Sequence, residues 1–195
     1  MVDEATRTET PEPMIRLEGV HKTFNPGSAR EVYALRGVDL ELAPGDFVTV
    51  IGTNGSGKST LLNAVAGSFL PDEGRIVIDG EELTGKPDFR RAHLISRVFQ
   101  NPYMGTAPNM TIAENLLLAH LRGRPRHPRV GLDSVLKEAF AERVRSLEMG
   151  LEGRLENLIG SLSGGQRQAL TLLMAVLRQP KVLLLDEHTA ALDPK

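Results

Sequence analysis

The chain has 195 residues, of which 23 are Lys or Arg and 25 are Asp or Glu, so its formal net charge is only −2. A length near 200 residues suffices for one domain, or one domain with a subdomain, whose core needs no covalent cross-link. The absence of cysteine excludes disulfides and thiolate metal sites, and the even charge balance argues against wholesale binding of nucleic acid or anionic lipid.

The first half of the chain begins with a tail and continues with strand patterns. Residues 1–13 are polar and acidic, lack the apolar segment of a secretory signal, and are predicted to be disordered. Alternating apolar and polar residues predict half-buried strands over 14–20 and 38–42. The run Phe47 to Ile51 is apolar and rich in β-branched residues, which is typical of a parallel strand buried on both faces.

Beyond residue 58 the pattern alternates between helices and strands. A helix is predicted from Lys58 to a capping Gly67, followed by short strands over 75–79 and 94–99. Thr111 starts a capping box, and apolar residues recur every three to four positions over 132–147, so residues from about 101 on predict a helical subdomain. A helix over 165–178 and a buried strand over 182–185 complete the series. No stretch reaches the ~18 apolar residues that a membrane-spanning helix needs.

A phosphate-binding pattern lies between the strand predicted over 47–51 and the helix that follows it. Two glycines stand five positions apart and are followed by Lys and Ser, in Gly52-Thr53-Asn54-Gly55-Ser56-Gly57-Lys58-Ser59. Such a loop curls so that successive N–H groups point at phosphate oxygens, and the helix N-terminus adds its positive end. Lys58 is expected to reach the β- and γ-phosphates, and the Ser59 hydroxyl to ligate Mg²⁺. The alternative is a glycine-rich turn before an ordinary helix, which the flanking strand and helix disfavour.

An acidic pair, Asp186-Glu187, follows the strand predicted over 182–185. Ligands of parallel sheets bind outside the carboxyl ends of the strands, so this pair is expected beside the phosphate loop. Asp186 is expected to hold Mg²⁺, and Glu187 to orient or deprotonate the attacking water. The alternative for the pair alone is a solvated strand end.

The pentapeptide Leu162-Ser163-Gly164-Gly165-Gln166 stands 104 residues after Lys58 and 20 residues before Val182. Taken alone, it is an N-cap serine with two glycines opening a helix. With these neighbours, residues 14 to 195 resemble the nucleotide-binding subunits of ATP-binding cassette (ABC) transporters, whose signature the pentapeptide matches in full. The segments 101–108 and 186–195 look most like a little-characterised bacterial branch that accompanies binding proteins of the tryptophan or tyrosine type.

This resemblance implies the fold class and the domain organisation. The expected class is α/β: a P-loop NTPase core with a mixed or parallel sheet, an N-terminal antiparallel β subdomain and an inserted α-helical subdomain. After the tail of residues 1–13, the cassette spans 14–195, is incomplete at its C-terminus, and carries the helical subdomain at about 101–165.

The resemblance also implies the site residues. ATP and Mg²⁺ are expected between the phosphate loop of one cassette and the signature of a second, in a head-to-tail homodimer. The residues expected to bind nucleotide are Phe24, Gly52, Thr53, Asn54, Gly55, Ser56, Gly57, Lys58, Ser59, Thr60, Ser163, Gly164, Gly165, Gln166 and Asp193. Those expected to act in catalysis are Glu187, Gln100 and Lys58, and those expected to hold the metal are Ser59, Gln100 and Asp186.

Two of these assignments have alternatives, and a residue next to Glu187 departs from the family pattern. Phe24 occupies the place of the aromatic residue that stacks on adenine, but a core phenylalanine is the other interpretation. Gln100 is otherwise a polar strand cap. His188 stands where many family members have proline, and a loop or interface role is favoured for it.

The function implied by the resemblance is ATP hydrolysis that powers transport of a small molecule through separate membrane permease subunits. Import is favoured, with an extracytoplasmic substrate-binding protein, no nucleic-acid partner, and a cytoplasmic position on the inner face of the plasma membrane. The alternatives are an exporter ATPase and an ATP-binding chain that does not turn over, because the switch histidine of the family lies beyond Lys195. A soluble ABC ATPase acting on DNA or ribosomes is disfavoured, since the chain has one cassette and no long coiled coil.

Overall fold

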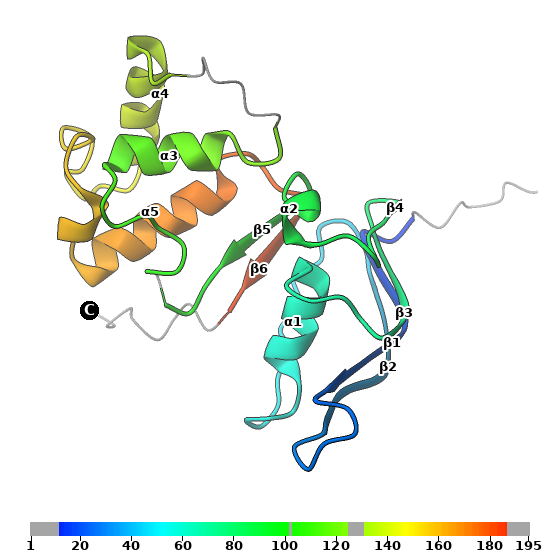
Figure 1. The fold of residues 1–195 in the computed structure, drawn as a ribbon. Coiled ribbons are helices and arrows are strands. Elements are labelled where there is room, and N and C mark those ends of the chain that lie inside the picture. The colour runs from blue at the N-terminus through cyan, green and yellow to red at the C-terminus, as the bar shows by residue number, and fades with distance from the viewer. Residues whose placement is uncertain (1–11, 102, 125–130, 187–195) are drawn as a thin grey trace, which may run out of the picture. The chain divides into compact units, whose positions relative to one another are not determined.

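The computed structural model describes residues 12–101, 103–124 and 131–186, and Figure 1 shows its ribbon. The chain divides into two compact units, the first ending at Pro87 and the second beginning at Asp88. The first unit contains β1 (Ile15–Phe24), β2 (Val32–Leu42), α1 (Lys58–Ala66), β3 (Glu73–Ile78) and β4 (Glu81–Glu82). The second contains α2 (Asp88–Arg91), β5 (Ile95–Val98), α3 (Ile112–His120), α4 (Ser134–Arg145), the 3₁₀ turn Ile159–Ser161, α5 (Gly164–Val176) and β6 (Val182–Leu185). Of the tail predicted over 1–13, residues 1–11 lie outside the described residues.

The first unit is built on an antiparallel sheet with the strand order β2-β1-β3-β4. Alternate residues of the central strands are buried, as the period of two in the sequence predicts, and they form the core of this unit: Ile15, Leu17, Val20, Ile76 and Ile78. The other face carries cross-strand ion pairs such as Arg16–Glu41 and Arg75–Glu82, each with a nitrogen–oxygen distance of 2.9 Å. Helix α1 packs against β2.

The strand predicted over Phe47 to Ile51 is wrong. These residues adopt no regular hydrogen-bonding pattern, and the Phe47 and Ile51 side chains are each 88% exposed. A strand exists only through a ladder to a neighbour, and the strands of the first unit pair with one another and not with this segment. The apolar run indicates a tendency to be buried, but it does not show whether a neighbouring strand is available to form hydrogen bonds with it.

The second unit contains a parallel pair of strands, which the sequence predicts as buried runs. β5 pairs with β6 in a register that places Ile95 beside Val182 and Val98 beside Leu185. Parallel neighbours need a long crossover, and here α3, α4 and α5 form it. Figure 1 shows α3 lying along α5, and these helices share a core with α4. That core contains Ile112, Leu116, Phe140, Val144, Leu151, Ile159 and Leu170.

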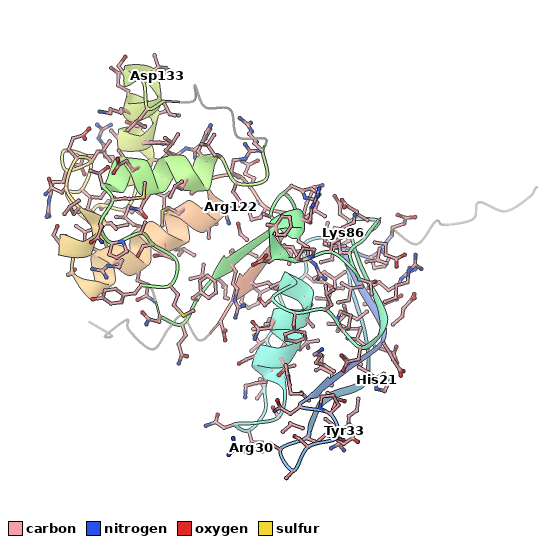
Figure 2. The ribbon with its side chains drawn as sticks, viewed as in Figure 1. His21, Arg30, Tyr33, Lys86, Arg122 and Asp133 are labelled. Carbon is pink, nitrogen blue, oxygen red and sulfur yellow. The ribbon has the colours of Figure 1, made fainter. Side chains whose placement is uncertain are left out.

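A partly buried arginine joins β5 to the C-terminal end of α5. Arg122, labelled in Figure 2, donates from Nη2 to the Met174 carbonyl at 2.6 Å and from Nη1 to the Ser96 hydroxyl. Ser96 Oγ in turn donates to the Ala175 carbonyl at 2.6 Å. Burial, followed by the nearby charge of Arg178, lowers the pKa of Arg122. These bonds use carbonyls near the end of α5 that have no partner within the helix.

Within the described residues, no helix combines the length and the apolar character needed to cross a bilayer.

Candidate nucleotide-binding site

The phosphate loop turns directly into α1, as the sequence predicts, although no strand precedes it. Gly57 is the N-cap of α1 with φ at 94°, a left-handed conformation that favours glycine. A Cβ atom on Gly57 would lie 2.8 Å from the Ala34 carbonyl oxygen, and one on Gly52 would lie 2.6 Å from Ser56 Oγ. Gly57 is therefore required both by its left-handed backbone and by close approach to a backbone atom, whereas the Ser56 side chain could rotate away from a Cβ atom on Gly52.

The loop is electropositive. No side chain caps the N-terminus of α1, and its first turn contains no acidic residue, so the positive end of the helix dipole is not compensated there. The Lys58 ammonium lies over the same loop, donating from Nζ to the carbonyls of Gly52 at 2.8 Å and Thr53 at 2.9 Å. This arrangement of helix N-terminus and lysine fits an anion such as a phosphate group.

A cavity of about 540 Å³ opens between this loop and β2. Tyr33, Leu35 and Val38 line it from β2, and the loop contributes Gly55 to Lys58. Its lining also includes two cations, Arg36 and Lys58. Apolar side chains with a few polar groups are typical of a small-molecule site, and the volume lies within the range of such pockets.

Phe24 lies at the end of β1 and is not a core residue, since its side chain is 36% exposed. Its ring meets Phe69 edge to face, with ring centres 5.4 Å apart, and the Lys22 ammonium lies 5.4 Å from the Phe69 ring centre. Lys22 Nζ also donates to the Asp72 carboxylate at 2.6 Å. This bond, followed by the Thr23 N–H, lowers the pKa of Asp72. The Phe24 ring is therefore held from one side and exposed on the other.

Gln100 and Asp186 follow neighbouring parallel strands, β5 and β6, at the same end of that pair. The Asp186 N–H donates to the Val98 carbonyl at 3.1 Å, which extends the ladder by one residue. Gln100 is exposed. The structure thus brings these two predicted residues to one sheet edge, where ligands of parallel sheets bind.

Asp186 has a partner that the sequence analysis missed. Arg97 of β5 donates from Nη2 to Asp186 Oδ2 at 2.8 Å. In the parallel register Arg97 lies beside Leu184, two residues before Asp186, and residues two apart share one face of a strand. The sequence feature that could have indicated this pair is a charged residue, Arg97, inside the predicted strand 94–99. Only the register of β5 with β6 shows that Arg97 faces Asp186.

The signature segment forms the start of α5. Ser163 is its N-cap and shares a capping box with Gln166: Ser163 Oγ accepts from the Gln166 N–H, and Gln166 Oε1 accepts from the Ser163 N–H, both at 3.3 Å. A Cβ atom on Gly164 or Gly165 would meet no atom within 4 Å. The glycines therefore leave the surface at this helix N-terminus open.

A buried arginine, which the sequence analysis also missed, supports this segment. Arg167 is 1% exposed and donates from Nη2 to the carbonyls of Gly160, at 2.9 Å, and Leu162, at 3.3 Å. Its guanidinium carbon lies 3.8 Å from the Tyr103 ring centre. Arg167 therefore joins the loop before the signature to the segment that follows Gln100.

The donor set predicted for the metal fits Mg²⁺. Ser59 carries a hydroxyl, Gln100 an amide oxygen and Asp186 a carboxylate, and each is an oxygen ligand of the kind that Mg²⁺ prefers. The described ranges contain no group of three or more His, Cys, Asp or Glu side chains arranged for a metal. Mg²⁺ is commonly held by one or two protein groups together with substrate phosphates, which suits this sparse set. Glu187 and Asp193 lie outside the described residues.

Comparison with known proteins identifies related chains. The family model described as ABC transporter matches residues 35–190. The chain is 42% identical over 191 residues to a tyrosine transport ATP-binding protein of Clostridioides difficile (strain R20291), across 93% of this chain and 72% of the relative. It is 35% identical over 188 residues to the lipoprotein-releasing system ATP-binding protein LolD of Roseobacter denitrificans (strain ATCC 33942 / OCh 114), across 93% of this chain and 78% of the relative.

Solved structures show the same fold. The dimeric post-hydrolysis state of the ATP-binding cassette MJ0796, bound to ADP and Pi, superposes with a TM-score of 0.75 at 31% identity, covering 92% of this chain and 76% of that one. The ADP conformation of the ABC transporter cassette MJ1267 gives a TM-score of 0.72 at 30% identity, covering 93% and 71%. The α/β fold of P-loop NTPases expected from the sequence is confirmed, and the chain belongs to the ABC transporter family as one of its ATPase subunits.

Proposed function

We propose that this chain binds MgATP at Gly52 to Thr60 and hydrolyses it to power import of a small molecule through separate membrane subunits. The observation that carries the proposal is the loop itself. A left-handed backbone and a close approach to the Ala34 carbonyl require glycine at Gly57, and Lys58 Nζ already lies over the loop carbonyls. When phosphates bind, the Lys58 ammonium exchanges these neutral carbonyls for charged oxygens, which make stronger hydrogen bonds.

The chemistry is assigned to residues at the loop and at the ends of β5 and β6. Ser59, Gln100 and Asp186 hold Mg²⁺, which when bound neutralises charge on the β- and γ-phosphates. Glu187 accepts a proton from water as the water oxygen bonds to the γ-phosphorus and the bond to the β–γ bridging oxygen breaks. Lys58 and the N–H groups at the start of α1 stabilise the charge that develops on the phosphates. Phe24 offers the exposed side of its ring to adenine.

A second copy of the chain, arranged head to tail, completes the site. Gly164 and Gly165 open α5 although glycine is a poor helix former, and none of the described residues lies where their side chains would be. The open surface leaves room for a group from outside this chain, and a phosphate held by another cassette fits a helix N-terminus. In this arrangement Ser163 and Gln166 contact the nucleotide in trans, and Asp193 lies at the interface.

Import is favoured over release by the relatives. A spermidine/putrescine import ATP-binding protein is 38% identical to this chain, against 35% for the lipoprotein-releasing protein, and the 42% identical relative is named for transport of tyrosine, a small molecule. The proposed partners are two membrane permease subunits and an extracytoplasmic substrate-binding protein, which places the chain at the inner face of the plasma membrane. Release of a lipoprotein or export of a small molecule is the second candidate.

Replacing Glu187 with glutamine tests the function. We expect the purified Glu187→Gln chain to bind MgATP like the wild type but to release phosphate at least about a hundredfold more slowly, because a general base contributes roughly that much. The variant should also accumulate as an ATP-bound dimer, measured by analytical ultracentrifugation. Glu138→Gln, on the exposed face of α4, is the matched control and should behave as wild type.

Two other outcomes have clear meanings. Normal hydrolysis by Glu187→Gln removes Glu187 from its assigned role. ATP binding by the wild type with no phosphate release favours the alternative of a chain that binds without turnover, and a failure to bind ATP at all rejects the proposed function.

A further inference from the structure

The ion pair between Arg97 and Asp186 lies at the edge of the parallel strand pair. Arg97 Nη2 and Asp186 Oδ2 are 2.8 Å apart, and the two side chains retain only 15% and 20% of their exposure. The Arg97 guanidinium carbon lies 4.7 Å from the Phe99 ring centre, so a neighbouring side chain orients the cation. A pair this well covered is screened less by water and salt than an ordinary surface ion pair.

A carboxylate in this position needs a positive neighbour. Removing a charged carboxylate from water is costly unless a counter-charge and hydrogen bonds replace the water. In the proposed function Mg²⁺ supplies that charge when nucleotide is bound. In the structure Arg97 is a positive neighbour of Asp186, and it donates to one of the two carboxylate oxygens.

We propose that Arg97 is a built-in counter-cation that holds Asp186 while the site is empty and competes with Mg²⁺ for it. Mg²⁺ must either displace the guanidinium from Oδ2 or bind beside a positive charge. Both routes weaken metal binding, because one ligand oxygen is occupied or because two cations repel at short range. Arg97 is thus a positioning residue that sets the Mg²⁺ concentration at which nucleotide binding tightens. This inference rests on the proposed function.

The first test measures how nucleotide affinity depends on Mg²⁺. The whole chain is titrated with trinitrophenyl-ATP by fluorescence, first in EDTA and then at increasing free Mg²⁺, for wild type, Arg97→Met and Arg97→Lys. Methionine keeps an apolar stem that can pack on Phe99 and loses the charge, whereas lysine keeps the charge. We expect Arg97→Met to reach half of its Mg²⁺-dependent tightening at about three- to tenfold lower Mg²⁺, and Arg97→Lys to remain near wild type.

Metal binding is also read directly, without hydrolysis. Mn²⁺ bound to the chain with ATP is counted by electron paramagnetic resonance, and the Arg97→Met chain should hold Mn²⁺ more tightly than wild type by the same factor. Affinity for nucleotide in EDTA should be unchanged, because the loop of Gly52 to Thr60 is untouched. An Arg97→Met chain that needs as much Mg²⁺ as wild type, or more, overturns the competition.

A second test needs neither nucleotide nor metal. Thermal unfolding in EDTA is compared for wild type, Asp186→Asn, Arg97→Met and the double variant. We expect Asp186→Asn to lower the midpoint by several degrees when Arg97 is present, and by much less in the Arg97→Met background, because the ion pair is already lost. Additive effects would show that Arg97 does not hold Asp186 in the empty molecule and so reject the inference.

The two tests separate failure of this inference from failure of the proposed function. If wild-type affinity for nucleotide does not respond to Mg²⁺ at all, the metal site of the proposed function is wrong, and the competition with it. If the wild type responds to Mg²⁺ and Arg97→Met does not shift that response, only the competition is wrong.

Discussion

Replacing Lys58 with methionine is expected to weaken MgATP binding at least about a hundredfold. Hydrogen bonds to a charged group are worth about 1.5–3 kcal/mol each, and Lys58 Nζ, which makes two such bonds to loop carbonyls, is placed to exchange them for phosphate oxygens. Losing two charge-assisted bonds corresponds to a factor of roughly 10² or more in affinity. Isothermal titration calorimetry with MgATP measures the change.

The matched control is Lys137→Met. Lys137 is on α4 and pairs with Glu156 at 2.7 Å on the surface, so its removal should change nucleotide affinity by less than about twofold. Because the carbonyls of Gly52 and Thr53 are exposed and can bond to water, Lys58→Met should unfold at nearly the wild-type temperature. A Lys58→Met chain that binds MgATP with wild-type affinity would place the nucleotide elsewhere.

Replacing Gly74 with alanine is expected to lower the free energy of unfolding by about 3–5 kcal/mol, the sum of a strained backbone and an overpacked contact. Gly74 has φ at +91°, and a Cβ atom there would lie 2.3 Å from the Gly19 carbonyl oxygen and 2.5 Å from its carbon. Both are backbone atoms and cannot rotate away. Urea unfolding followed by circular dichroism measures the loss.

The close approach at Gly74 has a cause in the sheet. The pairing of β1 with β3 shifts register between Glu18 and His21, and Gly19 lies inside that irregularity with φ at +53°. Gly85→Ala is the control, because Gly85 has neither a left-handed backbone nor an atom within 4 Å of the added Cβ. Its effect should stay within about 0.5 kcal/mol. Equal effects of the two substitutions would contradict the steric argument.

The local part of the fold was predictable because its signals lie close together in the sequence. Thr111 and Glu114 are three residues apart, and the structure has the expected capping box at the start of α3. Gly67 ends α1 with a left-handed backbone, as the sequence predicts. Hydrophobic periodicity likewise identified α4, whose Phe140 and Val144 are buried. Each of these features is decided within about one helical turn.

What the sequence could not predict depends on contacts between distant residues. Arg97 and Asp186 are 89 positions apart, and Arg122 reaches Met174 across 52 positions. The first contact follows from the register of β5 against β6, and the second from the packing of α5 on β5. No short stretch of sequence predicts either of these arrangements. The loop of Gly52 to Ser59 was found because its spacing is local, whereas the cation beside Asp186 was not.

The exposed segment from Phe47 to Ile51 has a consequence for the behaviour of the protein in solution. Its five residues carry no charge, no proline and no glycine, have high β-propensity, and leave Phe47 and Ile51 open to solvent. Such a segment is a template for intermolecular pairing. The chain is therefore expected to self-associate as its concentration rises, and Phe47→Lys to raise its solubility, as light scattering would measure. Storage at low protein concentration should therefore limit this association.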